Sequence, residues 1–286
     1  MGPPAALACC GGRGVMTVRS DVRWLLERVE NGRIVFRIGA TSGNRIAEWP
    51  TLARLSASHD GRVASFEAMP GVDPDVITKL RNGAVAGLLA HLRGQMALHA
   101  ACFALERRAV ACLGLSGAGK STAVADACLR GGAALVSDDV LVVEPGASEF
   151  LVSSREESHW LTPPSLNALV GCMSDAGKTC VDARPTCAEK VPLAALVWLE
   201  FSESVPVPEL RPLRRSEVFQ RVLTAVVRFA LDDQDAIARE FDVLSRLCDR
   251  VPGFTLTRPH DLEFLGRARR LLFDLTAIGV TAEGSH

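Results

Sequence analysis

Near the middle of the chain, residues 114–122 read Gly114-Leu115-Ser116-Gly117-Ala118-Gly119-Lys120-Ser121-Thr122. The first eight match the pattern G-x-x-x-x-G-K-[ST], in which the backbone N–H groups of a glycine loop hold nucleotide phosphates. An apolar run precedes the loop, and a helix is expected from Ser121 to Arg130, ended by two glycines. This context predicts a nucleotide-binding α/β fold, with Lys120 at the β- and γ-phosphates and the Ser121 hydroxyl on Mg²⁺.

An acidic pair, Asp138-Asp139, follows a short apolar run that we expect to be the strand of the next β-unit. A carboxylate in this position can hold Mg²⁺, and a second one can accept the proton of an attacking hydroxyl. Successive side chains of an extended segment point in opposite directions, so the two carboxylates need not do the same job. A solvated turn is the commonest role of such a pair, but its place beside the glycine loop favours a functional one.

A histidine, His99, lies in the apolar run upstream of the loop. A lone histidine in such a run is usually a hydrogen-bonded core residue. The apolar runs on either side of the charged turn Glu106-Arg107-Arg108 could pair as a hairpin, which would return His99 towards the loop. The spacing therefore permits a catalytic role for His99 without requiring it.

The composition limits the classes of protein to which the chain can belong. The chain has 286 residues, 48% of them hydrophobic, and a formal net charge of −1, so it can build a core and has no global attraction to nucleic acid or anionic membrane. No apolar run approaches the ~20 residues that span a bilayer. The nine cysteines form no C-x-x-C pair, which argues against a zinc site, and without a convincing export signal we expect reduced thiols in the cytoplasm.

Three parts are expected along the chain. Residues 1–20 are expected to be a disordered extension, too weakly apolar for a signal peptide, with Met16 as an alternative start. Residues 21–95 read as a small strand-rich segment with one helix that begins at Asp73-Pro74. Residues 96–280 read as the α/β core, in which we expect strands at 140–143, 192–200 and 253–257 and helices at 216–229, 235–250 and 261–273.

The stretch from His99 through the glycine loop to Val140 resembles the catalytic core of the HPr kinase/phosphorylase family, which shares its nucleotide-binding fold with ATP-dependent phosphoenolpyruvate carboxykinase. In that family a histidine precedes the loop lysine by the interval seen between His99 and Lys120, and an Asp-Asp pair follows. The resemblance implies ATP and Mg²⁺ as cofactors, Asp138 as the proton acceptor for a substrate serine, and His99 and Lys120 at the transferred phosphate. With that division, Ser121 and Asp139 are assigned to the metal.

Within the family, the chain most resembles the shorter HPr-kinase-like proteins of lasso-peptide biosynthesis, some of which phosphorylate a serine of a precursor peptide. They pair a small strand-rich front segment with a core of this kind. The resemblance therefore implies a kinase for a seryl hydroxyl of a peptide, with a lasso-type precursor as the acceptor. The partner would be a peptide or small protein rather than nucleic acid or membrane. True HPr kinases are hexamers, so a homo-oligomer is one of the states open to the chain.

The chain also departs from the family. True HPr kinases carry a glycine-rich signature, with a glutamate that completes the metal site, and residues 149–170 do not align with it. The third metal ligand, the dephosphorylating activity and the family's later arginine therefore stay unassigned. Lys178 is the better candidate for a second cation on the phosphates, with a surface-turn lysine as an equal alternative, and Arg214-Arg215 are expected at the surface. His159 and Trp160 could shape a substrate site, although packed positions are commoner.

Two other functions stay open. One is an HPr(Ser) kinase/phosphorylase that acts on a carrier protein. The other is a nucleotide-gated module that binds a peptide and transfers nothing, since such a switch would need most of the same loop residues.

Overall fold

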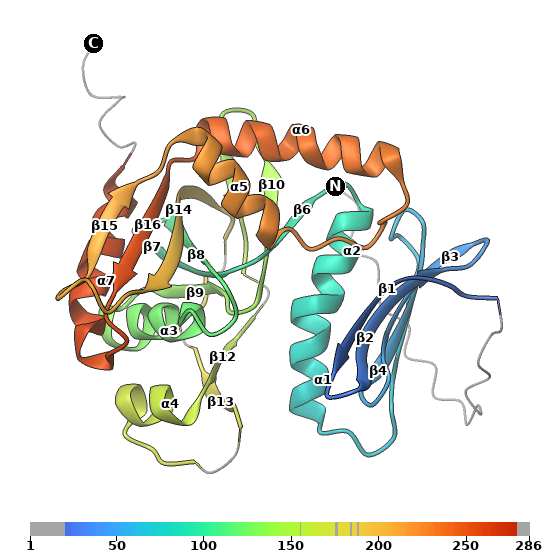
Figure 1. Ribbon diagram of the computed structural model, residues 1–286, viewed down its shortest axis with the longest axis horizontal. Helices are drawn as coiled ribbons and strands as arrows, with labels where there is room; N and C mark the ends of the chain where they lie inside the picture. Colours follow the sequence, from blue (N-terminus) through green and yellow to red (C-terminus); the bar gives the residue numbers. More distant parts are fainter. Residues whose placement is uncertain (1–20, 155, 175–176, 184, 188, 279–286) are drawn as a thin grey trace. The chain divides into compact units, whose positions relative to one another are not determined.

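A computed structural model describes residues 21–278 except 155, 175, 176, 184 and 188, so the predicted extension 1–20 lies outside the described residues. The chain divides into two compact units (Figure 1). The described residues of the first unit are 21–95 and Val227–Glu240, and those of the second are Met96–Val226 and 241–278. Each unit has a sheet of its own.

The first unit is an antiparallel sheet whose strands follow one another in chain order: β1 (Arg23–Glu30), β2 (Arg33–Ala40), β3 (Asn44–Trp49), β4 (Ala53–Ser58) and β5 (Ala64–Ala68). The predicted helix forms with a turn of π-helix in its middle, as α1 (Pro74–Leu80), η1 (Arg81–Val85) and α2 (Ala86–Leu92). Its start is fixed by Asp73, whose carboxylate accepts a hydrogen bond from the N–H of Asp75 at 2.8 Å.

Residues 227–240 belong to the first unit, although the sequence was interpreted as placing them in the α/β core. Phe229 is fully buried and packs in one hydrophobic cluster with Leu55 of the sheet and Leu88 of α2. The helix expected over 216–229 accordingly ends early, as α5 (Arg215–Ala225), which frees the following residues for this core. Burial of Phe229, rather than a helix-stop signal, decides this boundary.

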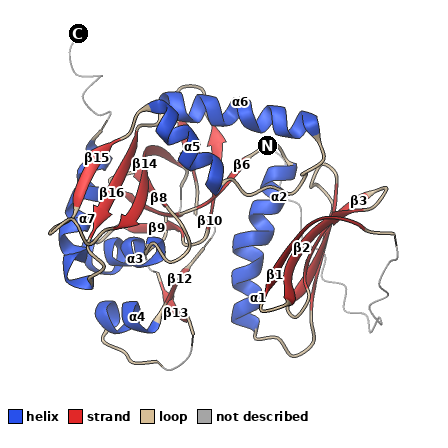
Figure 2. Cartoon of the chain, in the orientation of Figure 1, coloured by secondary structure: helices blue, strands red, loops and turns tan. Residues whose placement is uncertain are grey.

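The second unit is a mixed α/β structure, as the sequence predicted, around a curled sheet (Figure 2). Its strands are β6 (Met96–His99), β7 (Ala101–Leu105), β8 (Arg108–Leu113), β9 (Ala134–Ser137), β10 (Val140–Pro145), β11 (Phe150–Val152), β14 (Val191–Phe201), β15 (Glu209–Pro212) and β16 (Gly253–Arg258). Strands β8, β14 and β16 are parallel, with β14 in the middle. Their carboxyl ends therefore meet at one edge, where the glycine loop begins.

Helices cover both faces of this sheet. Helices α5 and α6 (Gln234–Arg250) pack on one face around Leu196 and Val222, and α3 (Lys120–Gly131) and α7 (Leu265–Asp274) pack on the other around Val197 and Leu272. A two-stranded ribbon of β12 (Ser158–Leu161) and β13 (Thr179–Asp182) and the helix α4 (Pro163–Val170) complete the unit, with the short turns η2 (Leu262–Phe264) and η3 (Leu275–Ala277) beside α7.

The expected hairpin forms between β7 and β8, and its turn residues Glu106 and Arg107 have φ of 50° and 64°, the left-handed backbone that two-residue hairpins favour. His99 lies outside this hairpin, because the apolar run divides at Ala100. Strand β6 pairs with β10, whereas β7 pairs with β8 and β9. The pairing with β10, and not the hairpin, positions His99.

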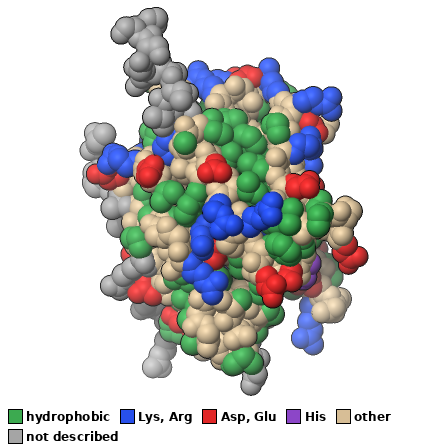
Figure 3. All heavy atoms as spheres, turned by 90° about the vertical axis from the view of Figure 1, so that its left-hand side faces the viewer, with side chains coloured by type: hydrophobic (Ala, Val, Ile, Leu, Met, Phe, Trp, Pro, Cys, Tyr) green, Lys and Arg blue, Asp and Glu red, His purple; other side chains and the backbone are tan. Residues whose placement is uncertain are grey.

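The face shown in Figure 3 carries basic side chains near its middle, with acidic and hydrophobic side chains around them. It is therefore not a surface of one charge sign, which agrees with the net charge of −1. Within the described residues, no helix combines the length and apolar character needed to cross a membrane.

Candidate active site

The glycine loop joins β8 to α3 and depends on glycine at both of its ends. Gly114 has φ of +145°, and a Cβ there would lie 2.7 Å from the carbonyl oxygen of Leu199 on the neighbouring strand. Gly119 has φ of +81° and is the N-cap of α3. A Cβ on Gly119 would overlap the Nη2 atom of Arg258. The loop is thus held against β14 and β16 by contacts that only glycine allows.

We expect Gly119→Ala to remove nucleotide binding and to destabilise the second unit by about 1–3 kcal/mol, because the new methyl group combines a left-handed backbone with an overlap. Thermal unfolding and titration with ATP measure the two effects. Gly117→Ala is the matched control, since Gly117 has a similar φ of +83° but nothing within 4 Å of its Cβ position. Equal behaviour of the two variants would show that the overlap with Arg258 is unimportant.

Lys120 is buried at the start of α3, and its ammonium lies over the loop. The Nζ atom donates to the carbonyl oxygens of Gly114 at 3.0 Å and Leu115 at 3.1 Å. Burial lowers the pKa of Lys120, and the negative charge of Asp139 opposes this shift more strongly than any other carboxylate. The lysine therefore has the place at the loop that the sequence predicted, with Asp139 as the carboxylate that acts most strongly on it.

His99 and Asp139 lie next to each other and close to Lys120. Strand pairing sets His99 opposite Val140, and the N–H of Ala100 donates to the carbonyl oxygen of Asp139 at 3.1 Å. The Nδ1 atom of His99 lies 3.3 Å from Oδ1 of Asp139. Burial lowers the pKa of His99 despite the charge of Asp139, and the charge of Lys120 lowers it further. The structure thus brings His99, Asp139 and Lys120 together.

Asp138 points away from this group. Its side chain is 3% exposed, whereas that of Asp139 is 37% exposed. One carboxylate oxygen of Asp138 accepts a hydrogen bond from the N–H of Trp160 at 3.2 Å, and the other lies 3.9 Å from Nδ1 of the fully buried His159. The two carboxylates therefore have different surroundings. Asp138 and Asp139 form a bend between β9 and β10, so this difference does not come from the alternation of an extended strand. His159 and Trp160 belong to the surroundings of Asp138.

Sequence reasoning missed Glu156. This residue is buried, and its carboxylate accepts a hydrogen bond from the N–H of Asp138. It comes from the segment 149–170, which could not be aligned with the glutamate-bearing signature of the resembled family. The only sequence signal for it was the Glu156-Glu157 pair, and such a pair is too common to single out a site residue.

Ser121 and Thr122 have different surroundings. The Ser121 hydroxyl donates to the carbonyl oxygen of Asp138 at 3.5 Å, so it lies between the loop and the acidic pair. The Thr122 hydroxyl instead lies 2.8 Å from the hydroxyl of Ser165 and connects α3 to α4. Within the described part of the chain, no three His, Cys, Asp or Glu side chains are grouped as a metal site. Mg²⁺ commonly keeps several waters and substrate phosphates as ligands, so Ser121 with few carboxylates still fits it.

Lys178 is exposed, and its charge lowers the pKa of both His99 and Lys120. Lys178 therefore lies near His99 and Lys120, with its own ammonium open to solvent. This position is compatible with a contact to phosphates, which stays a prediction.

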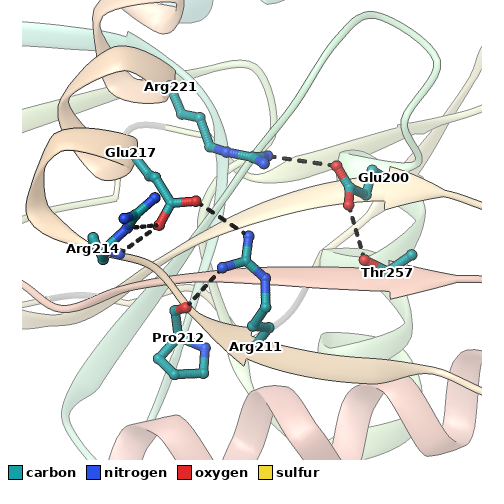
Figure 4. Close-up of polar contacts among 7 residues, drawn as sticks. All are labelled: Glu200, Arg211, Pro212, Arg214, Glu217, Arg221 and Thr257. Carbon is teal, nitrogen blue, oxygen red and sulfur yellow. Dashed lines mark hydrogen bonds and ion pairs between the residues drawn. The ribbon is translucent and has the colours of Figure 1, made fainter.

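A second polar cluster joins α5 and β15 to β14 and β16, with Glu200 and Thr257 near the carboxyl ends of their strands (Figure 4). Glu200 accepts from the Thr257 hydroxyl at 2.9 Å and lies 3.5 Å from the Arg221 guanidinium. Glu217 accepts from the N–H of Arg214 at 2.9 Å and also holds Arg211. These contacts fasten α5 and β15 to the parallel strands beside the glycine loop. Arg214 and Arg215 are both exposed, and Arg215 forms an ion pair with Asp249.

No family model matches the chain, and no curated protein matches it by sequence. One solved structure to which it is similar is the HPr(Ser) kinase/phosphatase from Coxiella burnetii, with a TM-score of 0.35 and 16% sequence identity. The likeness covers 62% of this chain and 98% of that one. The chemistry of the site therefore has to follow from its own residues.

Proposed function

We propose that the chain is an Mg²⁺-dependent phosphotransferase that moves the γ-phosphate of ATP to a hydroxyl group. The observation that carries this proposal is the grouping of Lys120, His99 and Asp139 at the end of a glycine loop. Phosphoryl transfer needs positive charge on the phosphates, which Lys120 supplies, and an acceptor for the hydroxyl proton, which a carboxylate beside the lysine supplies. A loop that only binds a nucleotide has no need of that proton acceptor.

Each residue has a definite part in this proposal. Lys120 neutralises charge on the transferred phosphate, and the Ser121 hydroxyl is the side-chain ligand of Mg²⁺, which neutralises the rest when bound. The Nδ1 atom of His99 faces the Asp139 carboxylate, so its N–H serves to hold that carboxylate, and the ring can donate to a phosphate oxygen as well only when both nitrogens carry a proton.

The hydroxyl proton goes to Asp139 in our proposal. This differs from the assignment that the family resemblance implied, in which Asp138 took the proton and Asp139 held the metal. The exposed fractions of the two side chains favour Asp139 as the proton acceptor. An acceptor hydroxyl can reach the 37% exposed carboxylate of Asp139 but not the 3% exposed one of Asp138. Asp138 then serves to join the acidic segment to β12 through Trp160.

We further propose that the acceptor is a seryl hydroxyl of a peptide, with a lasso-type precursor as the first candidate and the cytoplasm as the place of the reaction. The support for this acceptor is the resemblance of the stretch from His99 to Val140, together with the small strand-rich segment that precedes it.

Incubation of the protein with γ-labelled ATP and Mg²⁺ tests the proposal. We expect label on a serine-containing precursor peptide and none on its Ser→Ala counterpart. Label on the carrier protein HPr, and its release by inorganic phosphate, would instead favour an HPr(Ser) kinase/phosphorylase. Nucleotide binding without label on any hydroxyl would favour the peptide-binding module.

A further inference from the structure

A buried arginine lies directly behind the glycine loop. Arg258 is the last residue of β16 and is 1% exposed, which makes it one of the largest fully buried side chains among the described residues. Burial lowers the pKa of Arg258 to about 10, which is still far above neutrality. The guanidinium is therefore a full positive charge in the interior of the second unit.

Within the part of the chain that the structure describes, this charge lacks a carboxylate partner. Among the described residues no Asp or Glu oxygen forms an ion pair with Arg258, and its Nε atom is buried without a hydrogen-bond partner. The charge of Asp126 acts on it, but the Asp126 carboxylate is bound to Arg269 at 3.0 Å. The close neighbour of the guanidinium is instead an aromatic ring, that of Phe201, with 4.5 Å to the ring centroid.

The guanidinium points at the loop. Its Nη2 atom occupies the place where a Cβ of Gly119 would be, at the N-cap of α3. Lys120 follows immediately and lies over the loop. The phosphate-binding loop is thus accompanied by two positive charges, one of them fixed in the core, in addition to the partial positive charge of the helix N-terminus.

A buried charge without an ion-pair partner destabilises the fold, and an anion that comes close offsets part of this cost. The phosphates for which this loop is suited are such an anion. We propose that Arg258 is a positioning residue that holds Gly119 in its left-handed conformation and strengthens phosphate binding as a fixed positive charge behind the loop. The inference rests on the proposed function, because it requires that the loop bind a nucleotide.

The test is the affinity of Arg258→Met for ATP, ADP and AMP, together with its unfolding temperature without ligand. Methionine has nearly the length of the buried stem but no charge. We expect the Kd for ATP to rise at least tenfold, the Kd for ADP to rise less and that for AMP least, because the effect follows the charge on the ligand. The unfolding temperature should stay unchanged or rise, since an unpaired buried charge is removed.

Arg258→Lys separates charge from shape, and it serves if the methionine variant does not fold. It keeps a positive charge at this place and should recover most of the affinity for ATP. Arg269→Met is the matched control, because Arg269 also packs against α3 but has a carboxylate partner. It should lower the unfolding temperature and leave the Kd for ATP within twofold.

Two results would overturn the inference. One is an Arg258→Met protein that binds ATP as tightly as the wild type. The other is a loss of affinity of the same size for ATP, ADP and AMP that lysine does not recover, which would mean that Arg258 is only structural. Failure of the wild-type protein to bind ATP at all would instead contradict the proposed function, so the two failures are distinguishable.

Discussion

Replacement of Lys120 by methionine should lower the rate of phosphoryl transfer at saturating MgATP by about 10²–10³-fold, the usual effect of removing one donor from a developing charge. Hydrogen bonds to the carbonyl oxygens of Gly114 and Leu115 already hold the Lys120 ammonium over the loop. Its loss leaves the phosphate charge to Mg²⁺ and to the buried guanidinium of Arg258. The measurement is the kcat for transfer of labelled phosphate to the acceptor peptide.

The fold should survive this change, because burial already disfavours the charged form of Lys120 and methionine fills the same space. Lys190→Met is the matched control: Lys190 is exposed and pairs with Glu144 at the surface, so its loss should change neither the kcat nor the unfolding temperature. A Lys120→Met protein with the kcat of the wild type would remove the lysine from the reaction, and with it the main support for a transferase.

The parts of the fold that could be predicted are those with strong local patterns. The glycine loop, the helix after it and the buried strand over 192–200 form as expected, because glycine spacing and apolar runs determine them with little help from distant residues. Strands β12 and β13 were missed. Each is four residues long, and their partners are about twenty residues apart in the sequence, so only the tertiary pairing defines them.

The sequence predicted several members of the candidate site, among them His99, Lys120 and Asp139, but not the directions of their side chains. Alternation along an extended segment predicts that Asp138 and Asp139 point apart, and it cannot say which one faces the loop. The pairing of β6 with β10 decides this by setting His99 beside Asp139. Arg258 was not predicted at all, since an arginine at a strand end usually reaches solvent, and its closeness to Gly119 is the observation on which our proposal for it rests.

The second large effect expected is that of Asp139→Asn, which should lower the kcat for transfer by about 10²–10⁴-fold, the usual range for loss of a general base. Asparagine has the same shape but a much weaker affinity for a proton. Because the amide can still face Nδ1 of His99, the local structure and the Kd for ATP should stay close to those of the wild type. Asp138→Asn is the matched control, because it makes the same change from carboxylate to amide at the neighbouring residue.

We expect Asp138→Asn to keep its kcat within tenfold, because the amide oxygen can still accept the hydrogen bond from Trp160 and the side chain lies away from the loop. A titration with Mg²⁺ then separates the roles of Asp139. If this residue held the metal, high Mg²⁺ would restore the activity of Asp139→Asn, whereas a lost proton acceptor cannot be replaced by more metal. A larger loss in Asp138→Asn than in Asp139→Asn would return the proton to Asp138, and a movement of the Asp138 carboxylate towards the loop would then have to accompany the binding of ATP.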